Sequence, residues 1–513
     1  MQDNTIAFLR KELQRIDGGT PPAVVETHIS EVFLGATLAW KLKKAVKLPY
    51  LDFTSVERRL ALCERELAMN RRSAPSLYRS VHRVVRRDDG NLAIDADGTL
   101  VDAVLEMKRF DEDGLIDRMA VRGNLTPLIV TRLAAVIANF HSHAEPSITG
   151  ARSGSQRVAE ILQINQSAFI ATWQIFPSSR IDHLIEASRH HCKRRARLLD
   201  TRQREGRVRL CHGDLHLRNI VLLEGIPTLF DCLEFDVEMA TTDILYDLSF
   251  VLMDLWHRGL RSLANLLLNR YLDDIHFLEG SDETPGLPLL GLFMSMRAAV
   301  RAHVQAARAL EMTDLEPARE TVAGEAGAYL DLATALLAPH PIRLVAIGGL
   351  SGSGKSTAAA AIAAEVGSAP GARVLSSDRV RKAMHGVTPL TRLGPEAYRP
   401  EVSARVYATL LERAAATLSA GHSVIVDAVF DRAEERARIE AVAKAAAVPF
   451  TGIWLEAPQA VLLERVARRQ GDPSDAGVDV VRRQFEQGVV DVGWTRLPAG
   501  SVHDWTALLR LLQ

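Results

Sequence analysis

The chain has 513 residues, 47% of them hydrophobic and 24% charged, a composition typical of a globular protein. A single hydrophobic core stops growing well below this length, so we expect two or three domains. The 62 Lys and Arg residues balance 63 Asp and Glu residues. The resulting net charge of −1 argues against a protein that coats nucleic acid or an anionic membrane.

The sequence also indicates a compartment. No run of about 18 apolar residues is present, and the first residues, Met1-Gln-Asp-Asn-Thr5, lack the basic flank and apolar stretch of a secretory signal. The four cysteines form no CxxC pair, so we expect reduced thiols. These features predict a cytoplasmic protein.

A proline-rich joint at Ala338-Pro339-His340-Pro341 should separate two domains, residues 1–338 and 341–513. Before the joint, extended stretches come early (27–34, 39–46 and 102–107), and helical patterns dominate from about residue 128, which predicts a small sheet-rich lobe followed by a larger helical lobe. After the joint, short apolar runs alternate with Ala-rich helical patterns. This alternation predicts a parallel sheet covered by helices, with strands at 344–347, 373–375, 424–426 and 453–455.

A phosphate-binding loop follows the first of these strands. Residues 349–356 match G-x-x-x-x-G-K-[ST] at every fixed position and lead directly into a helical pattern. In such a loop the backbone N–H groups surround phosphates, the lysine neutralises the outer phosphates, and the last hydroxyl can bind Mg²⁺. The predicted nucleotide-binding residues are Gly349, Ser351, Gly352, Ser353, Gly354, Lys355, Ser356 and Thr357, with Ser356 also a metal ligand.

Charged residues after the next strands narrow the reaction. Asp378 and Arg381 begin a helix and should share one face, so the carboxylate could accept the proton of an attacking hydroxyl while the arginine binds an anionic group of the acceptor. Asp427 ends a third strand, where a metal-bound water or the acceptor would lie. Arg465 and Arg469 lie in a basic helical run that could close as a lid over the transferred group. A helix-capping aspartate and ordinary solvated charges remain the alternative interpretation.

In these motifs and their order, residues from about 343 to 513 resemble the P-loop kinase family that includes gluconate kinase, the zeta toxins and the kinase domain of polynucleotide kinase. The resemblance implies that Asp378 is the general base, that Arg381 binds the acceptor, and that Arg465 or Arg469 is a lid residue with a catalytic role. The acceptors of the family range from sugars and amino sugars to 5′-hydroxyl ends.

A second phosphate-handling pattern lies before the joint. His212-Gly-Asp-Leu-His-Leu-Arg-Asn219 places Asp214 and Asn219 five residues apart, and Asp231 follows twelve residues later. This is the spacing of a protein-kinase-like catalytic loop and its metal aspartate. We predict that Asp214 lies near the acceptor hydroxyl and that Asn219 and Asp231 are metal ligands. Two histidines four residues apart could instead suggest zinc, but Gly213 favours a loop over the helix that such a site needs.

The ATP lysine of this domain is expected on the strand around residues 39–46. Lys41 and Lys43 lie on one face of it, and Glu64 and Glu66 lie on the helix that follows. We assign Lys43 and Glu66 as nucleotide-binding residues, with Lys41 left open as the alternative.

Residues 25–335 resemble the aminoglycoside-phosphotransferase-like branch of the protein-kinase-like fold, because the HGDxHxxN form of the loop is specific to that branch. The whole chain resembles bacterial proteins that fuse such a domain to a P-loop kinase. Two departures are visible: there is no G-x-G-x-x-G over the phosphates, and Asp231-Cys-Leu233 replaces Asp-Phe-Gly.

The expected fold is an α+β protein-kinase-like bilobal domain followed by an α/β P-loop domain with a parallel sheet flanked by helices. The expected function is that of an ATP- and Mg²⁺-dependent phosphotransferase with two nucleotide sites, whose P-loop domain phosphorylates a hydroxyl of a small molecule such as a sugar or amino sugar. Two alternatives stay open: a polynucleotide 5′-hydroxyl kinase, and an N-terminal ATP-binding domain that regulates the P-loop kinase. Nucleic acid is a less favoured partner, no membrane partner is expected, and the sequence gives no oligomeric state.

Overall fold

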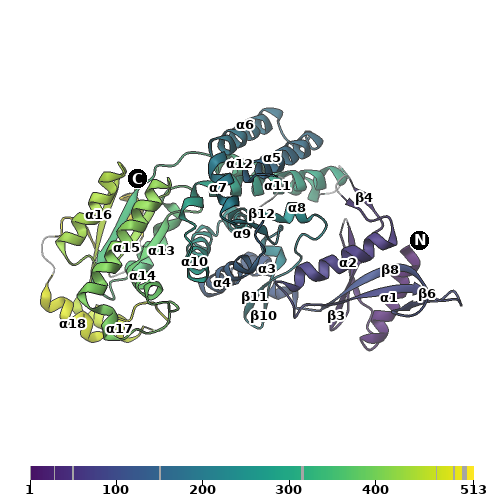
Figure 1. Cartoon of the computed structure of the whole chain (residues 1–513), viewed down its shortest axis with the longest axis horizontal. Helices are drawn as coiled ribbons and strands as arrows, with labels where there is room; N and C mark the ends of the chain where they lie inside the picture. Colours follow the sequence, from purple (N-terminus) through teal and green to yellow (C-terminus); the bar gives the residue numbers. More distant parts are fainter. Residues whose placement is uncertain are drawn as a thin grey trace. The chain divides into compact units, whose positions relative to one another are not determined.

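The computed structural model describes residues 2–27, 29–48, 51–148, 152–313, 317–469, 471–488, 492–499 and 505–512 (Figure 1). The chain forms two compact units: Met1–Gly150 with Gln203–Val251, and Ala151–Arg202 with Leu252–Gln513. We call them unit 1 and unit 2. In the described part of the chain, no helix combines the length and apolar character needed to cross a membrane.

Unit 1 contains a six-stranded antiparallel sheet in the order β1-β2-β3-β8-β6-β7. Apolar residues of one face, including Trp40 and Val104, pack on Leu9 and Leu13 of the first helix, while the opposite face carries Leu105 and packs on the second helix. The alternation of side chains along β3 therefore turns Lys41 and Lys43 toward the second helix. These elements are α1 (Gln2–Ile16), β1 (Ala23–Glu26), β2 (Ser30–Leu34), β3 (Leu38–Lys43), α2 (Val56–Arg71), β6 (Tyr78–Arg86), β7 (Leu92–Ile94) and β8 (Thr99–Lys108).

The rest of unit 1 carries the catalytic-loop region on short strands and helices. Two antiparallel pairs, β10 with β11 and β12 with β9, flank residues 211–219. A two-residue pair, β4 (Lys47–Leu48) with β5 (Leu51–Asp52), precedes α2. The remaining elements are η1 (Glu112–Gly114), α3 (Ile116–Val121), α4 (Pro127–His143), β9 (Val208–Leu210), η2 (Leu217–Asn219), β10 (Ile220–Leu223), β11 (Ile226–Leu229), α8 (Val237–Ala240), β12 (Thr241–Asp243) and the start of α9 (Ile244–His257).

Unit 2 begins with helices. The long helices α11 and α12 pack against each other, and α5 packs on both α6 and α11. Regular structure ends at Ala335 and resumes at Leu344, so the proline-rich joint interrupts the helical run; both sides of the joint belong to unit 2, whereas the sequence placed a domain boundary there. The helices are α5 (Gly154–Ala171), α6 (Ser178–Arg194), α7 (Ala196–Arg204), α10 (Arg261–Glu279), η3 (Thr284–Leu289), α11 (Leu290–Glu311) and α12 (Ala318–Ala335).

The C-terminal part of unit 2 is a five-stranded parallel sheet in the order β14-β15-β13-β16-β17 (Figure 1). Residues of α14, α15 and α16 pack on one face, and residues of α13 and α19 pack on the other. All four predicted strands are present, and β17 is an additional strand. The elements are β13 (Leu344–Gly349), α13 (Lys355–Ile362), η4 (Ala363–Glu365), β14 (Arg373–Ser376), α14 (Ser377–Met384), η5 (Pro395–Tyr398), α15 (Pro400–Ser419), β15 (Val424–Asp427), α16 (Ala433–Ala445), β16 (Phe450–Glu456), α17 (Gln459–Ala467), α18 (Val478–Gln487), β17 (Thr495–Pro498) and α19 (Thr506–Arg510).

Candidate functional site

The phosphate loop connects β13 to α13 and depends on glycine geometry. Gly349 and Gly352 have φ angles of 143° and 85°, a region that L side chains rarely adopt. A Cβ at Gly352 would also lie 2.9 Å from the carbonyl oxygen of Leu462. Gly354, with φ of 87°, is the residue directly before α13, so the helix begins at Lys355 with its first N–H groups facing the loop.

Lys355, Ser356 and Asp427 meet at the carboxyl edge of the sheet. Ser356 Oγ donates to Asp427 Oδ2 at 2.5 Å, and Lys355 Nζ donates to the carbonyl oxygen of Leu350 at 3.1 Å. Burial raises the pKa of Asp427, and the Lys355 ammonium opposes that shift. The pKa of Lys355 is lowered by burial, and the negative charges of Asp427 and Asp378 offset only part of that shift. A hydroxyl in contact with a carboxylate beside a phosphate loop is the donor set that holds Mg²⁺ in P-loop proteins, so these residues fit the ion.

The two predicted residues on α14 have different surroundings. The charge of Asp378 raises the pKa of both Lys355 and Asp427, so its carboxylate lies near enough to interact with both. Arg381 is only 7% exposed, and its Nη1 donates to the carbonyl oxygen of Ala397 at 2.6 Å. Its guanidinium also lies 4.6 Å from the ring centre of Tyr398. Arg381 Nε is buried and has no hydrogen-bond partner among the described residues, so one donor remains for a ligand.

The two predicted lid arginines have different surroundings. Arg465 Nη2 donates to the carbonyl oxygen of Ala499 at 2.7 Å. Arg469 lowers the pKa of Lys355 through its charge, and its Nη1 is buried without a hydrogen-bond partner in the described part of the chain. The geometry therefore favours Arg469 over Arg465 as the arginine that faces the phosphate loop.

Two contacts of the lid region were missed from the sequence. Gln484 on α18 accepts a hydrogen bond from the backbone N–H of Ser351 at 3.0 Å. Asp475 accepts from the backbone N–H of Leu393 at 3.0 Å and from the Tyr398 hydroxyl at 2.7 Å, and it is ion-paired with the buried Lys382. Only the basic run near residue 468 marked this segment in the sequence, because an isolated Gln or Asp carries no pattern of its own.

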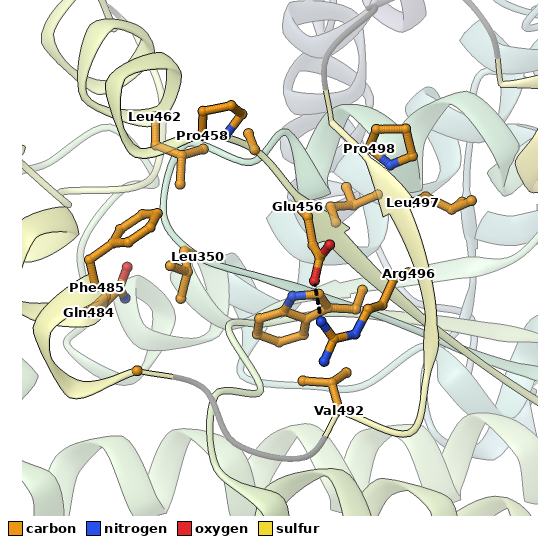
Figure 2. A pocket seen from close by; sticks show the side chains of 14 residues that line it. Leu350, Glu456, Pro458, Leu462, Gln484, Phe485, Val492, Arg496, Leu497 and Pro498 are labelled. Carbon is orange, nitrogen blue, oxygen red and sulfur yellow. Dashed lines mark hydrogen bonds and ion pairs between the residues drawn. The ribbon is translucent and has the colours of Figure 1, made fainter.

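A pocket of about 550 Å³ opens beside the phosphate loop (Figure 2). Leu350, Leu462 and Phe485 line one side of it, and the ion pair of Glu456 with Arg496 lines the other at 2.9 Å. A smaller cavity of about 290 Å³ lies under the lid segment, where it is lined by Arg392, Arg469, Asp472 and Asp475 among others. The first pocket combines apolar walls with a few polar groups, and the second is mainly polar.

In unit 1, the catalytic-loop residues are held together by hydrogen bonds. Asn219 Nδ2 donates to Asp214 Oδ2 and to the Asp214 carbonyl oxygen, each at 3.0 Å. Asp247 accepts from the backbone N–H groups of His212 at 3.2 Å and Gly213 at 2.9 Å, and thereby supports the loop. Because Asn219 uses its amide nitrogen here, its amide oxygen can serve as a metal ligand.

The contacts around Glu66 distinguish Lys41 from Lys43. Lys41 Nζ lies 2.7 Å from Glu66 and 2.8 Å from Asp231, and it is 13% exposed. Lys43 has no exposed side chain and pairs with Glu66 and Glu234. Lys41 thus joins the helix glutamate to the aspartate after the catalytic loop, and the geometry favours it over Lys43 as the lysine that faces a nucleotide.

The charges of this cluster are strongly coupled. Burial raises the pKa of Glu66, but Lys41 and Lys43 outweigh burial and hold that pKa at about 2. Burial and the charge of Glu66 raise the pKa of Glu234. Glu64, the other sequence candidate, lies on the exposed face of α2.

Comparison with known families agrees with this geometry. Residues 56–280 match the family described as "Phosphotransferase enzyme family", and residues 344–489 match a family described as "AAA domain". These matches confirm the expected pairing of a phosphotransferase-family domain with a P-loop domain, and the chain is an enzyme of the kinase class.

Two mycobacterial proteins match most of the chain. The uncharacterized proteins Rv2004c of Mycobacterium tuberculosis and Mb2027c of Mycobacterium bovis are each 28% identical over 473 residues, which covers 89% of this chain and 88% of theirs.

Solved structures match portions of the chain. A gluconokinase from Sinorhizobium meliloti has 22% identity and a TM-score of 0.23, covering 34% of this chain and 90% of its own. A choline/ethanolamine kinase family protein from Mesorhizobium loti has 12% identity and a TM-score of 0.38, covering 65% of this chain and 98% of its own.

Proposed function

We propose that the protein is an ATP- and Mg²⁺-dependent phosphotransferase whose P-loop domain phosphorylates a hydroxyl of a small molecule such as a sugar or amino sugar. The observation that carries this proposal is the convergence of Lys355, Ser356, Asp427 and Asp378 at one edge of the parallel sheet. A carboxylate beside the phosphate loop that is not engaged with Ser356 gives the site a base, which simple nucleotide binding does not need.

Each residue of the site has a separate role in this proposal. Asp378 accepts the proton of the acceptor hydroxyl, whose oxygen attacks the γ-phosphorus of ATP while the bond to the β–γ bridging oxygen breaks and ADP leaves. Arg381 binds a polar or anionic group of the acceptor through its free Nε. Lys355 and Arg469 stabilise the charge of the transferred group. Mg²⁺, held by Ser356 and Asp427, would neutralise the phosphate oxygens when bound.

The larger cavity suits the nucleotide. This pocket of about 550 Å³ falls within the size range of small-molecule sites, and its apolar wall of Leu350, Leu462 and Phe485 suits a nucleoside (Figure 2). The smaller, polar cavity is lined by Arg469 and not by Asp378 or Arg381, so we assign no substrate to it.

We also propose a second nucleotide site in unit 1. Lys41, in place of Lys43, would contact the phosphates; Asn219 and Asp231 would hold a metal ion; and Asp214 would face an acceptor hydroxyl. The hydrogen bonds among the loop residues support this assignment, because they preorganise the groups that such a reaction uses.

A polynucleotide 5′-hydroxyl kinase is the second candidate for the P-loop domain. It would need a basic groove, whereas residues 341–513 contain 21 Lys and Arg against 18 Asp and Glu residues. A regulatory role for unit 1, with nucleotide binding but no turnover, is the alternative to a second reaction.

The test is ATP consumption by the full-length chain with Mg²⁺ across a panel of sugars, amino sugars, nucleosides and 5′-hydroxyl oligonucleotides. We expect one small-molecule class to stimulate turnover and Lys355→Ala to abolish it, with Lys444→Ala, an exposed lysine on α16, as the matched control. Asp214→Asn, paired with the exposed Asp88→Asn, tests unit 1 in the same assay. Stimulation that survives Lys355→Ala and is lost in Asp214→Asn would overturn the assignment of the main reaction to the P-loop domain.

A further inference from the structure

The helix α10 (Arg261–Glu279) contacts the edge strand of the parallel sheet through two buried asparagines. Asn265 Nδ2 donates to the carbonyl oxygens of Pro370 at 3.1 Å and Ala372 at 3.0 Å. Asn269 Nδ2 donates to the carbonyl oxygen of Ala372 at 3.1 Å, and its Oδ1 accepts from the backbone N–H of Val374 at 2.7 Å. These side chains therefore satisfy backbone groups of residues 370–374 that an edge strand leaves unpaired.

One turn further along α10, Asp273 makes two ion pairs with residues of the P-loop domain, and a third, at 3.3 Å, with Arg270 of its own helix. Its carboxylate contacts Arg373 on β14 at 2.5 Å and Arg379 on α14 at 2.6 Å. Burial alone would raise the pKa of Asp273, but Arg373 and Arg379 outweigh burial and hold that pKa well below its ordinary value. The carboxylate is therefore charged and bound to both arginines at neutral pH.

The two arginines lie on either side of the turn that leads to the proposed catalytic residues. Arg373 begins β14, and Arg379 lies in the first turn of α14, between Asp378 and Arg381. Adjacent residues in a helix point in different directions, so Arg379 can be held by α10 while Asp378 acts on the phosphate loop. The contacts with α10 thus hold both β14, at its first residue, and the first turn of α14.

We propose that Asp273 and Arg379 are positioning residues for the P-loop reaction, because their ion pair holds α14 where Asp378 and Arg381 meet the acceptor. This inference rests on the proposed function of Asp378. Residues 261–279 lie within the segment matched to the phosphotransferase family, whereas α14 lies within the P-loop match, so one matched segment sets the acceptor geometry of the other.

The test compares Asp273→Asn and Arg379→Gln, singly and together, in the full-length chain. The matched control is Glu365→Gln, which removes an exposed ion pair, 3.7 Å long, between Arg261 of α10 and the end of η4; neither residue lies on β14 or α14. Arg379→Lys keeps the positive charge and is the conservative variant for rescue. Three quantities are measured: acceptor kcat and KM, the affinity for ATP by calorimetry, and hydrogen exchange of the amides of α14 and of residues 350–357.

We expect acceptor kcat/KM to fall about tenfold to a hundredfold in Asp273→Asn and in Arg379→Gln, since a displacement of roughly 1 Å can have an effect of this size. The double variant should be no worse than the more impaired single variant, because both remove the same ion pair. ATP affinity should stay within about twofold of the parent chain, and Arg379→Lys should recover part of the loss. Faster exchange is expected in α14 only, and Glu365→Gln should match the parent chain.

Three outcomes would each show that the ion pair is only a general stabilising contact and would overturn the inference. They are a loss of ATP affinity equal to the loss of kcat/KM, faster exchange throughout unit 2, and additive effects in the double variant. The exchange measurement needs no acceptor. If no acceptor stimulates turnover, the proposed function fails, yet the local response of α14 still decides whether α10 holds that helix.

Discussion

Replacing Glu66 by glutamine should destabilise unit 1 strongly, because this carboxylate is shared by two buried lysines. Lys41 lies 2.7 Å from Glu66, and Lys43 is completely buried between Glu66 and Glu234. Glutamine has nearly the same shape but carries no charge. The substitution leaves Glu234 as the remaining carboxylate partner of Lys43 and removes the bridge between α2 and β3.

The expected magnitude follows from the pKa of Glu66, which is lowered from an ordinary 4.5 to about 2. At about 1.4 kcal/mol for each pKa unit, the charged form contributes roughly 3 kcal/mol to the stability of unit 1. Measured losses on breaking one partner of a buried ion pair are about 3–5 kcal/mol, which is the same range. Because the folded-state pKa lies below the unfolded one, this contribution is complete above about pH 4.5 and disappears as the pH falls toward about 2.

Hydrogen exchange of the amides in α2 and β3 measures the local free energy of opening, which suits a chain of two units better than one global melting curve. We expect Glu66→Gln to lower this free energy by about 3 kcal/mol at pH 7 and to differ much less from the parent chain at about pH 3. Glu64→Gln, on the exposed face of the same helix, is the control and should leave the exchange unchanged. Equal behaviour of the two variants at pH 7, or a difference that does not shrink with pH, would refute this account of the cluster.

Three further pairs of substitutions test the sites. Gly352→Ala should weaken nucleotide binding, since the new Cβ would lie 2.9 Å from the Leu462 carbonyl oxygen. The control is Gly386→Ala, because Gly386 has a similar positive φ but open space around it; this variant should show only a backbone strain of about 1–2 kcal/mol. ATP binding is measured by calorimetry. Equal ATP affinity of the two variants would contradict the loop geometry. In a Lys355→Ala background, Lys41→Ala should reduce nucleotide binding by unit 1. Lys43→Ala should mainly lower thermal stability, because it leaves Glu234 buried without its lysine. The reverse pattern would favour Lys43 as the nucleotide-binding lysine. Asp475→Asn should raise acceptor KM and speed proteolysis of residues 472–478, because Lys382 then loses its ionic partner; unchanged cleavage and kinetics relative to the exposed Asp479→Asn would count against a lid held by Asp475.

The sequence was most informative where a motif has fixed spacing. The glycines before Lys355 require particular backbone angles, and Asp427 must follow a buried strand, so their positions could be predicted together. The choice between Lys41 and Lys43 required the tertiary structure. The two lysines share a strand face, and they differ in their partners: Lys41 pairs with Asp231, and Lys43 pairs with Glu234. Arg465 and Arg469 lie in one basic run of the sequence, but α17 ends at Ala467, so Arg465 lies on the helix and Arg469 beyond its end; Arg465 donates to the carbonyl oxygen of Ala499.

Other features carried no local pattern at all. The strand β17 has only four residues and mostly exposed side chains. It therefore lacks the apolar run by which the other four strands of the sheet were recognised. The contacts of α10 join residues about 100 positions apart, and Asn265 and Asn269 on a helix suggest nothing about a distant strand edge. Long-range pairing of this kind is fixed by the tertiary structure and not by local preference.

The way α10 covers β14 also decides where the chain can be divided. A fragment that begins at the proline-rich joint would contain every motif of the P-loop domain, yet its edge strand would be an open template for pairing with a second copy. Arg373 and Arg379 would stand side by side without the carboxylate that joins them. Such a fragment should aggregate, whereas one that starts before Arg261 keeps the edge closed, so a P-loop fragment with a covered edge begins before the end of the segment that sequence comparison assigns to its neighbour.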